Sequence, residues 1–153
     1  MNKNDKKFTV VELFAGAGGL ALGLELAGFE DLLTNDNDKW SVETLKHNRP
    51  EWNVIHEDIR VLSEKGIKKF IKKNKEVDLL SGGYPCQAFS YAGKKLGMED
   101  TRGTLFYDYA KILDELRPKM FVAENVRGLV SHDKGRTLKT MIEVFKSKGY
   151  EVK

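Results

Sequence analysis

The sequence predicts an α/β protein built on a doubly wound, mostly parallel sheet. Short apolar runs alternate with helical patterns, and a glycine-rich turn joins the first run to the first helical pattern. No internal repeat, low-complexity tract or linker composition interrupts this alternation. With 153 residues and 41% hydrophobic content, the chain is long enough for one domain with a sizeable core. We therefore expect a single compact domain.

The first elements follow from the apolar runs and the residues that end them. A strand is expected over residues 8–14 and a helix over residues 20–27, with Gly28 placed to cap that helix. A second strand over residues 31–35 precedes a helix over residues 39–47, which ends before an Asn-Arg-Pro break.

The alternation continues to the end of the chain. In order, we expect a strand over residues 54–56, a helix over 62–74, a strand over 77–81, a helix over 104–116, a strand over 120–123 and a helix over 137–148. Five strand–helix repeats imply the doubly wound arrangement. Residues 149–153 are typical of a helix cap followed by the opening of a sixth strand, so we expect a sheet cut at its edge.

Composition narrows the class of protein. The chain has 26 Lys plus Arg against 23 Asp plus Glu, and its net charge of +3 is compatible with nucleic-acid binding without requiring it. The single cysteine excludes an internal disulfide framework, and no stretch approaches the roughly 20 apolar residues of a membrane span. The first eight residues carry no apolar core of a secretory signal, so a reducing cytoplasm is the expected location.

The only cysteine, Cys86, lies between Pro85 and Gln87 at the end of the apolar run 77–81. Gly82 and the glycine after it let the backbone turn sharply, and Pro85 stiffens the loop that presents the thiol. Cys86 is therefore a candidate nucleophile. The alternative is a small buried hydrophobic residue, which is the commoner fate of a lone cysteine.

The turn after the first strand has a G-x-G-G spacing formed by Gly16, Gly18 and Gly19. Backbone N–H groups and missing side chains at such a turn make room for a cofactor. The spacing differs from the dinucleotide fingerprint, because the next glycine is Gly23, so plain dinucleotide binding is disfavoured. The alternative is a tight turn with close helix packing.

Acidic residues follow the second and third strands. Asp36 lies about 20 residues after the glycines, where a carboxylate can accept hydrogen bonds from ribose hydroxyls. The alternative is an Asx turn or a helix cap, for which Asp38 is the better candidate. Asp58 and Ile59 offer one polar and one apolar contact at the same edge, a weak signal alone.

A carboxylate and an amide, Glu124 and Asn125, follow the strand expected over residues 120–123. We expect this to be a central strand beside the one that bears Cys86, so that both side chains face one crevice. A carboxylate there can have its pKa raised enough to donate a proton. The alternative is that Glu124 caps the next turn or pairs with a lysine.

The remaining polar and aromatic residues favour structural roles over ligand binding. A lysine strip is more typical of a solvated face than of a phosphate-binding surface; it comprises Lys65, Lys68, Lys69, Lys72, Lys73 and Lys75. The three histidines lack the spacing of a zinc site, so no metal is expected. Trp40 and Trp52 are expected to be core or rim aromatics.

Four ordered motifs resemble those of the DNA (cytosine-5) methyltransferases. They are Phe14-Ala15-Gly16-Ala17-Gly18-Gly19, Gly82-Gly83-Tyr84-Pro85-Cys86-Gln87-Ala88-Phe89-Ser90, Asp100-Thr101-Arg102-Gly103-Thr104-Leu105-Phe106 and Glu124-Asn125-Val126. The resemblance covers about residues 8–150 but only roughly the first half of a typical family member. It implies a Rossmann-like S-adenosylmethionine-dependent fold, truncated before the last strands, that forms an incomplete catalytic domain without a target-recognition domain.

The resemblance also assigns roles to residues. S-adenosylmethionine would be held by Phe14, Ala15, Gly16, Gly18 and Gly19, with Asp36 on the ribose, Asp58 and Ile59 at the adenine, and Leu105 lining the pocket. Cys86 would attack C6 of a cytosine flipped out of double-stranded DNA, while Glu124 would hold or protonate N3. Pro85, Gln87, Ser90 and Asn125 would contact the substrate.

Two departures from the family pattern matter. Asn37 replaces the aromatic or bulky apolar residue expected against the adenine, so either that stack is weaker or Trp40 substitutes for it. The target-recognition region and the family's closing segment have no counterpart, so sequence specificity would need a second polypeptide. We expect a catalytic half, either a subunit of a split enzyme in a restriction–modification system or a truncated remnant. A noncatalytic binding module and an RNA cytosine methyltransferase are the alternatives.

Overall fold

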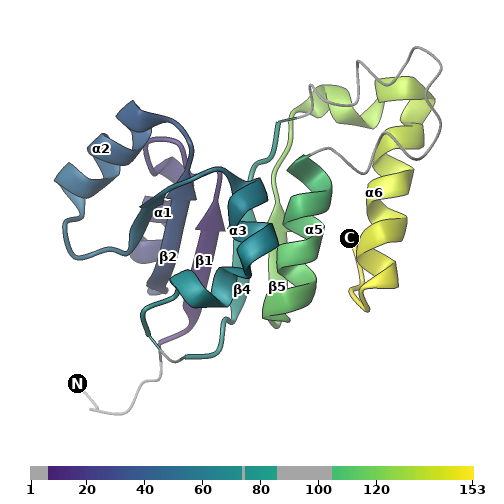
Figure 1. The fold of residues 1–153 in the computed structure, drawn as a ribbon. Helices are drawn as coiled ribbons and strands as arrows, with labels where there is room; N and C mark the ends of the chain where they lie inside the picture. Colours follow the sequence, from purple (N-terminus) through teal and green to yellow (C-terminus); the bar gives the residue numbers. More distant parts are fainter. Residues whose placement is uncertain (1–6, 74, 86–104) are drawn as a thin grey trace.

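Figure 1 presents a computed structural model of the chain, in which residues 7–73, 75–85 and 105–153 are described. The strands are β1 (Thr9–Leu13), β2 (Glu30–Asp36), β3 (Val54–His56), β4 (Leu79–Gly82) and β5 (Met120–Ala123). The α-helices are α1 (Gly19–Leu26), α2 (Lys39–Asn48), α3 (Ile59–Lys65), α5 (Leu105–Leu116) and α6 (Arg136–Ser147). Short 3-10 turns are η1 (Ile67–Phe70), η3 (Arg127–Val130) and η4 (His132–Gly135).

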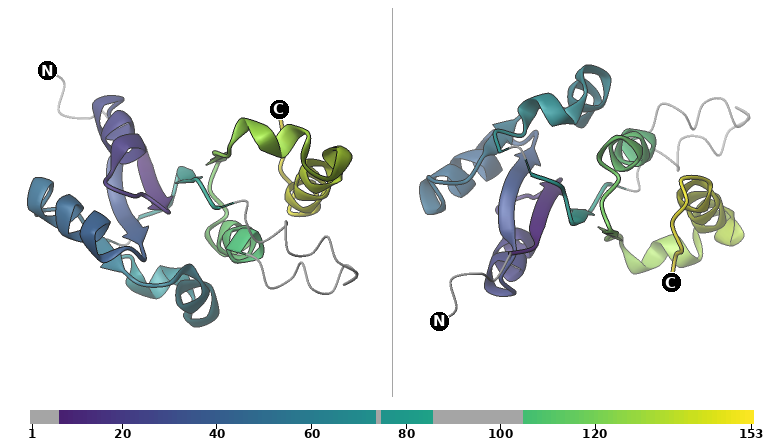
Figure 2. Two further views of the ribbon diagram at one scale, coloured as in Figure 1. Left: turned by 90° about the horizontal axis from the view of Figure 1, so that it is seen from above. Right: turned by 90° about the horizontal axis from the view of Figure 1, so that it is seen from below.

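The five strands form one parallel sheet in the order β3-β2-β1-β4-β5. The chain moves outward from β1 to β2 and β3, then returns to the other side of β1 for β4 and β5, which places a topological switch point between β1 and β4. Helix α1 covers one face of the sheet, and α3 and α5 cover the other (Figure 2). This arrangement confirms the predicted doubly wound α/β class.

The core lies around the two central strands. Every residue of β1 and β4 is buried, as expected for parallel strands covered on both faces. Helix α5 adds its apolar stripe to this core through Phe106, Tyr109 and Leu113, all at most 1% exposed. A smaller cluster beneath α2 contains Val42 and Leu45.

The predicted helix over residues 62–74 is wrong in its bounds. Helix α3 begins at Ile59 because the Asp58 carboxylate caps it, accepting a hydrogen bond from the Arg60 amide at 2.9 Å. It ends at Lys65 because Gly66 has a φ of +84°, which a right-handed helix cannot accommodate. A local cap and a local glycine thus outweighed the longer lysine-rich pattern.

Two expectations at the far edge of the sheet also need correction. β5 is an edge strand of the described sheet, where we expected a central one. Gly149 does cap α6 with a φ of +87°, but residues 150–153 form no strand. The Tyr150 hydroxyl instead donates a hydrogen bond to the Pro118 carbonyl at 2.7 Å.

No described helix is long and apolar enough to cross a membrane.

Candidate functional site

The candidate site lies where the five parallel strands end. In open α/β sheets, ligands bind outside the carboxyl ends of the strands at the switch point. The described residues that the sequence singled out end or follow the strands β1, β2, β3, β4 and β5 or begin α5, so the fold brings most of them to this edge (Figure 1).

The turn after β1 adopts a backbone that favours glycine. Gly16 and Gly18 have φ values of +55° and +93°, and Phe14 also has a positive φ of +57°. A Cβ on Gly18 would lie 2.5 Å from Leu45 Cδ2, so the absence of a side chain there serves helix packing. A Cβ on Gly16 or Gly19 would meet nothing within 4 Å. The turn therefore has a packed side at Gly18 and an open side at Gly16 and Gly19.

The two residues before Gly16 anchor this turn to the fold. Ala15 is 8% exposed and belongs to the small cluster beneath α2, while the Phe14 side chain packs against the main core. The Ala15 amide donates a hydrogen bond to the Asn35 carbonyl at 3.0 Å. The turn is consequently held to β2 as well as to its own strand.

Asp36 holds the turn to the end of β2. Its Oδ2 accepts a hydrogen bond from the Gly16 amide at 2.7 Å, and its Oδ1 accepts one from the Asp38 amide at 2.8 Å. The second bond is the Asx turn that the sequence left open as an alternative, and the first connects two predicted cofactor residues. The carboxylate of Asp38 caps α2 by accepting from the Ser41 amide at 2.8 Å, as predicted.

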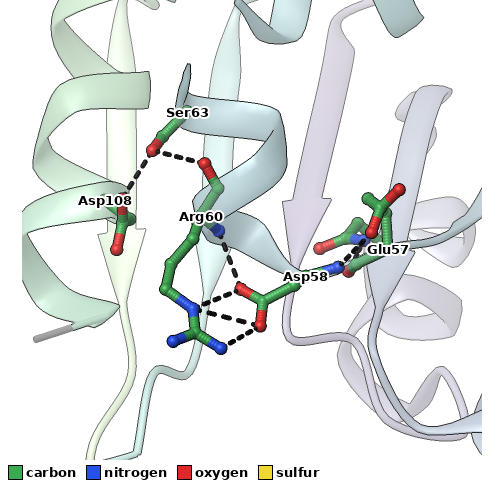
Figure 3. Close-up of polar contacts among 6 residues, drawn as sticks. Glu57, Asp58, Arg60, Ser63 and Asp108 are labelled. Carbon is green, nitrogen blue, oxygen red and sulfur yellow. Dashed lines mark hydrogen bonds and ion pairs between the residues drawn. The ribbon is translucent and has the colours of Figure 1, made fainter. Parts of the chain in front are cut away.

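Asp58 and Ile59 follow β3. The Asp58 carboxylate forms an ion pair with the Arg60 guanidinium, and hydrogen bonds from this side chain lower the pKa of Asp58 (Figure 3). Ser63 of the same helix donates a hydrogen bond to Asp108 of α5. The Ile59 side chain is 3% exposed and belongs to the main core. Asp58 is thus at the surface of this edge, and Ile59 lies behind it.

The loop after β4 is anchored by an aromatic residue. Tyr84 is 3% exposed and packs against Phe106 and Tyr109, with ring centroids 5.5 and 5.3 Å away. Pro85, which follows it, is exposed. Gly82 ends β4, and a Cβ there would lie 2.8 Å from the Leu13 carbonyl oxygen, so this glycine allows β4 to approach β1. Three predicted residues lie outside the described residues: Cys86, Gln87 and Ser90.

Glu124 and Asn125 follow β5, next to the end of β4. The Glu124 amide donates to the Gly82 carbonyl at 3.0 Å, and the Asn125 Nδ2 donates to the Tyr84 carbonyl at 2.8 Å. The Glu124 side chain is exposed, with Oε2 2.7 Å from the position of a Cβ on Gly83. The predicted acid therefore lies against the backbone that leads to Cys86.

The remaining predicted residues lie around this edge. Leu105 begins α5 and is partly buried against the main core. Trp40 is 69% exposed at the start of α2, whereas Trp52 packs against the small cluster. Two members of the lysine strip, Lys73 and Lys75, form ion pairs with Glu30.

Sequence reasoning missed two residues that position this edge. The side chain of Asn35, 2% exposed, donates hydrogen bonds to the Ile55 and Glu57 carbonyls at 3.1 and 2.8 Å and so fixes the end of β3 against β2. Its position beside Asp36 in a polar run was the available signal. Tyr109 donates to the Val122 carbonyl at 3.1 Å, and nothing local in the sequence distinguishes it from an ordinary core aromatic.

Comparison with known proteins decides the family. A sequence model of the C-5 cytosine-specific DNA methylases matches residues 8–153. The chain belongs to this family. It is 57% identical over 150 residues to the type II methyltransferase M.Sau96I of Staphylococcus aureus, covering 98% of this chain and 34% of the relative. It is 53% identical over 147 residues to M.PspPI of a Psychrobacter strain, covering 96% and 34%.

A solved structure agrees with this assignment. The crystal structure of a DNA modification methyltransferase encoded within an Escherichia coli prophage superposes with a TM-score of 0.74 at 28% identity. The match covers 92% of this chain and 38% of that protein. This member of the C-5 cytosine methylase family therefore spans about a third of the length of the two curated relatives.

Proposed function

We propose that this chain carries the catalytic centre that transfers a methyl group from S-adenosylmethionine to C5 of a cytosine flipped out of double-stranded DNA. The proposal rests on two groups of polar residues that lie at the same edge of the sheet. One is the Gly16 turn clasped by Asp36, and the other is the Glu124–Asn125 pair bonded to the loop that precedes Cys86. The family assignment supplies the reaction class.

The residues after β1 and β2 fit the proposed cofactor. Gly16 and Gly19 leave open space where a side chain would lie, and that space would admit a ligand against the backbone. We assign the walls of the site to Phe14, Ala15, Gly18 and Leu105, the ribose contact to Asp36, and the adenine contacts to Asp58 and Ile59. When bound, S-adenosylmethionine supplies an electrophilic methyl group on a sulfonium.

The chemistry assigned to the chain's own residues begins with Cys86. Its thiolate adds to C6 of the cytosine, and the electron pair of the C5–C6 double bond moves through the ring toward N3, where Glu124 supplies a proton or a hydrogen bond. C5 is then nucleophilic and would form the bond to the methyl carbon as the bond from that carbon to the sulfonium sulfur breaks, which would leave a neutral thioether. Loss of the C5 proton to water, elimination of the Cys86 thiolate and return of any N3 proton to Glu124 would restore the aromatic ring.

The target cytosine must leave the base stack before Cys86 can reach C6. We assign contacts with the extruded base and its backbone to Pro85, Gln87, Ser90 and Asn125. Asn125 would act partly through the loop, because its amide holds the Tyr84 carbonyl at 2.8 Å. A reducing cytoplasm would keep Cys86 available as a thiol.

We further propose that a second polypeptide provides target recognition and that the pair acts in a restriction–modification system. The relatives M.Sau96I and M.PspPI are type II methyltransferases, which supports the restriction–modification part of the proposal. One face of β5 supports the part of the proposal that concerns a second polypeptide, since Met120 and Val122 alternate along the strand and are 57% and 41% exposed. Uncovered apolar faces of parallel sheets are uncommon.

The decisive experiment measures transfer of labelled methyl groups to DNA by the chain alone and with the products of neighbouring genes. A 5-fluorocytosine oligonucleotide, which blocks the final elimination, should form a covalent adduct detectable by mass spectrometry. Cys86→Ser should abolish both signals. Cofactor binding without any adduct, with or without added gene products, would instead identify a noncatalytic binding module.

A further inference from the structure

The strand β3 is short and lies at the edge of the described sheet. It comprises the three residues Val54–His56 and pairs with β2. A strand of this length forms few ladder hydrogen bonds, so other contacts must help to fix its carboxyl end. The residues that we assign to the adenine, Asp58 and Ile59, follow that end closely. Whatever fixes the end of β3 therefore also places the adenine wall of the proposed site.

The side chain of Asn35 ties the end of β3 to β2. Asn35 is 2% exposed, and its Nδ2 donates hydrogen bonds to the carbonyls of Ile55 and Glu57 at 3.1 and 2.8 Å. The two bonds use both amide hydrogens, and because a carbonyl oxygen can only accept, they fix the direction in which the amide group points. A side chain without donors would leave both carbonyls without this partner.

The main chain of Asn35 contacts the opposite wall of the proposed site. Its carbonyl accepts a hydrogen bond from the Ala15 amide at 3.0 Å, in the turn after β1. The next residue, Asp36, accepts from the Gly16 amide at 2.7 Å. Asn35 thus binds the glycine turn through its carbonyl and the end of β3 through its side chain. The separation of the two walls depends on this one residue.

A second asparagine makes the same kind of contact at the other end of β3. Asn53 is 9% exposed, and its Nδ2 donates to the carbonyls of Leu32 and Phe70 at 3.1 and 2.9 Å. It precedes the strand, so its bonds lie at the amino end and away from the edge where ligands bind in such sheets. The chain therefore provides two buried asparagines with similar bonds, of which Asn35 alone adjoins the proposed cofactor residues.

We propose that Asn35 is a positioning residue for S-adenosylmethionine, whose side chain holds the adenine wall at the separation from the glycine turn that the intact cofactor spans. Asn35 acts through Asp58 and Ile59 and does not contact the reacting atoms. The identity of the ligand rests on the proposed function, whereas the bonds of Asn35 are present without it.

The first test compares Asn35→Ala with Asn53→Ala, which is the matched control. Both variants should lose stability in urea unfolding, because each deprives two carbonyls of their donor. At a temperature at which all the proteins are folded, calorimetry should show that Asn35→Ala weakens S-adenosylmethionine binding about 10-fold. The affinity of Asn53→Ala should stay within about 2-fold of the wild type, since distant sites act independently. If either variant does not fold, serine at the same two positions gives a milder comparison.

The second test asks whether Asn35 acts through the adenine wall. Asp58→Ala removes one proposed adenine contact. Combined with Asn35→Ala, it should weaken cofactor binding by less than the product of the two single effects, because the wall that Asn35 positions has already lost a contact. Combined with Asn53→Ala, it should weaken binding by that product.

Two results would overturn the positioning role. One is an equal loss of affinity in Asn35→Ala and Asn53→Ala, which would show that Asn35 acts through general stability. The other is independence of Asn35→Ala and Asp58→Ala in the second test. A wild-type chain that binds no S-adenosylmethionine would instead contradict the proposed cofactor and, with it, any positioning role, and that result involves neither substitution.

Discussion

The end of the site at β1 and β2 is held by side-chain hydrogen bonds between described residues, whereas part of the end at β4 and β5 lies outside them. At the first end, Asp36 clasps Gly16 and Asn35 fixes β3, all through hydrogen bonds of 3.1 Å or less. At the second end, Asn125 joins the two loops through its bond to the Tyr84 carbonyl, and the Glu124 side chain is exposed. We expect the proposed cofactor half, at β1 and β2, to be altered separately from the proposed catalytic half, at β4 and β5.

The largest expected effect comes from a substitution that should slow methyl transfer without weakening cofactor binding. Glu124→Gln removes the proposed proton donor at N3, and general acid catalysis contributes about 10²- to 10⁴-fold. We expect methyl transfer to slow by that factor in a reconstituted preparation, with the affinity for S-adenosylmethionine unchanged. Single-turnover methylation and isothermal titration calorimetry measure the two quantities. A parallel loss of cofactor affinity would mean that the two halves are not independent.

The second substitution should weaken cofactor binding and lies in the proposed cofactor half. Asp36→Ala deletes the acceptor of the Gly16 and Asp38 amides, and hydrogen bonds to charged groups contribute about 1.5–3 kcal/mol. We expect cofactor affinity to fall about 10- to 100-fold in calorimetry. Asp38→Ala is the control, because it removes only the α2 cap and should cost about 1 kcal/mol of unfolding free energy. Equal losses of affinity in both variants would contradict the role that we assign to the two hydrogen bonds of Asp36.

Two neighbouring glycines test the packed and open sides of the turn. Gly18→Ala forces a side chain into a left-handed backbone with its Cβ 2.5 Å from Leu45, and we expect a loss of about 2 kcal/mol of unfolding free energy. Gly19→Ala meets nothing within 4 Å and starts a helix, so its stability should be unchanged or higher. Urea unfolding of both variants measures the difference. Similar losses would show that the turn is uniformly packed.

The smallest effect concerns the ion pair after β3. The pKa of Asp58 is lowered by Arg60, so its contribution to stability is present above the unfolded pKa and is lost as pH falls through the folded value. Asp58→Asn retains the helix cap but loses the charge, so we expect a cost of about 0.5 kcal/mol at pH 7. That cost should decrease in urea titrations as the pH falls below the unfolded pKa and through the lowered folded pKa. A constant difference across pH would indicate a loss of packing instead.

Local signals in the sequence determined most of the elements. The strands at residues 54–56 and 120–123 match the prediction, since short apolar runs between polar breaks leave little freedom in their bounds. The Asp38 cap and the Gly28 and Gly149 helix ends also follow from local chemistry. The third helix was misjudged because the effect of Gly66 depends on its backbone angle, which composition does not reveal.

Only the tertiary structure decided which residues meet. Asp36 holds Gly16 across 20 residues, and Asn125 holds Tyr84 across 41. The Glu12 and Asp31 side chains share a face because Asp31 pairs with Val10, two residues before Glu12 on β1. The sequence singled out Asp36, Glu124 and Asn125 by type and by position after strands, but it could not say what each would bind. Side-chain partners depend on strand order and register, which arise from packing the whole sheet and are not encoded in any one segment.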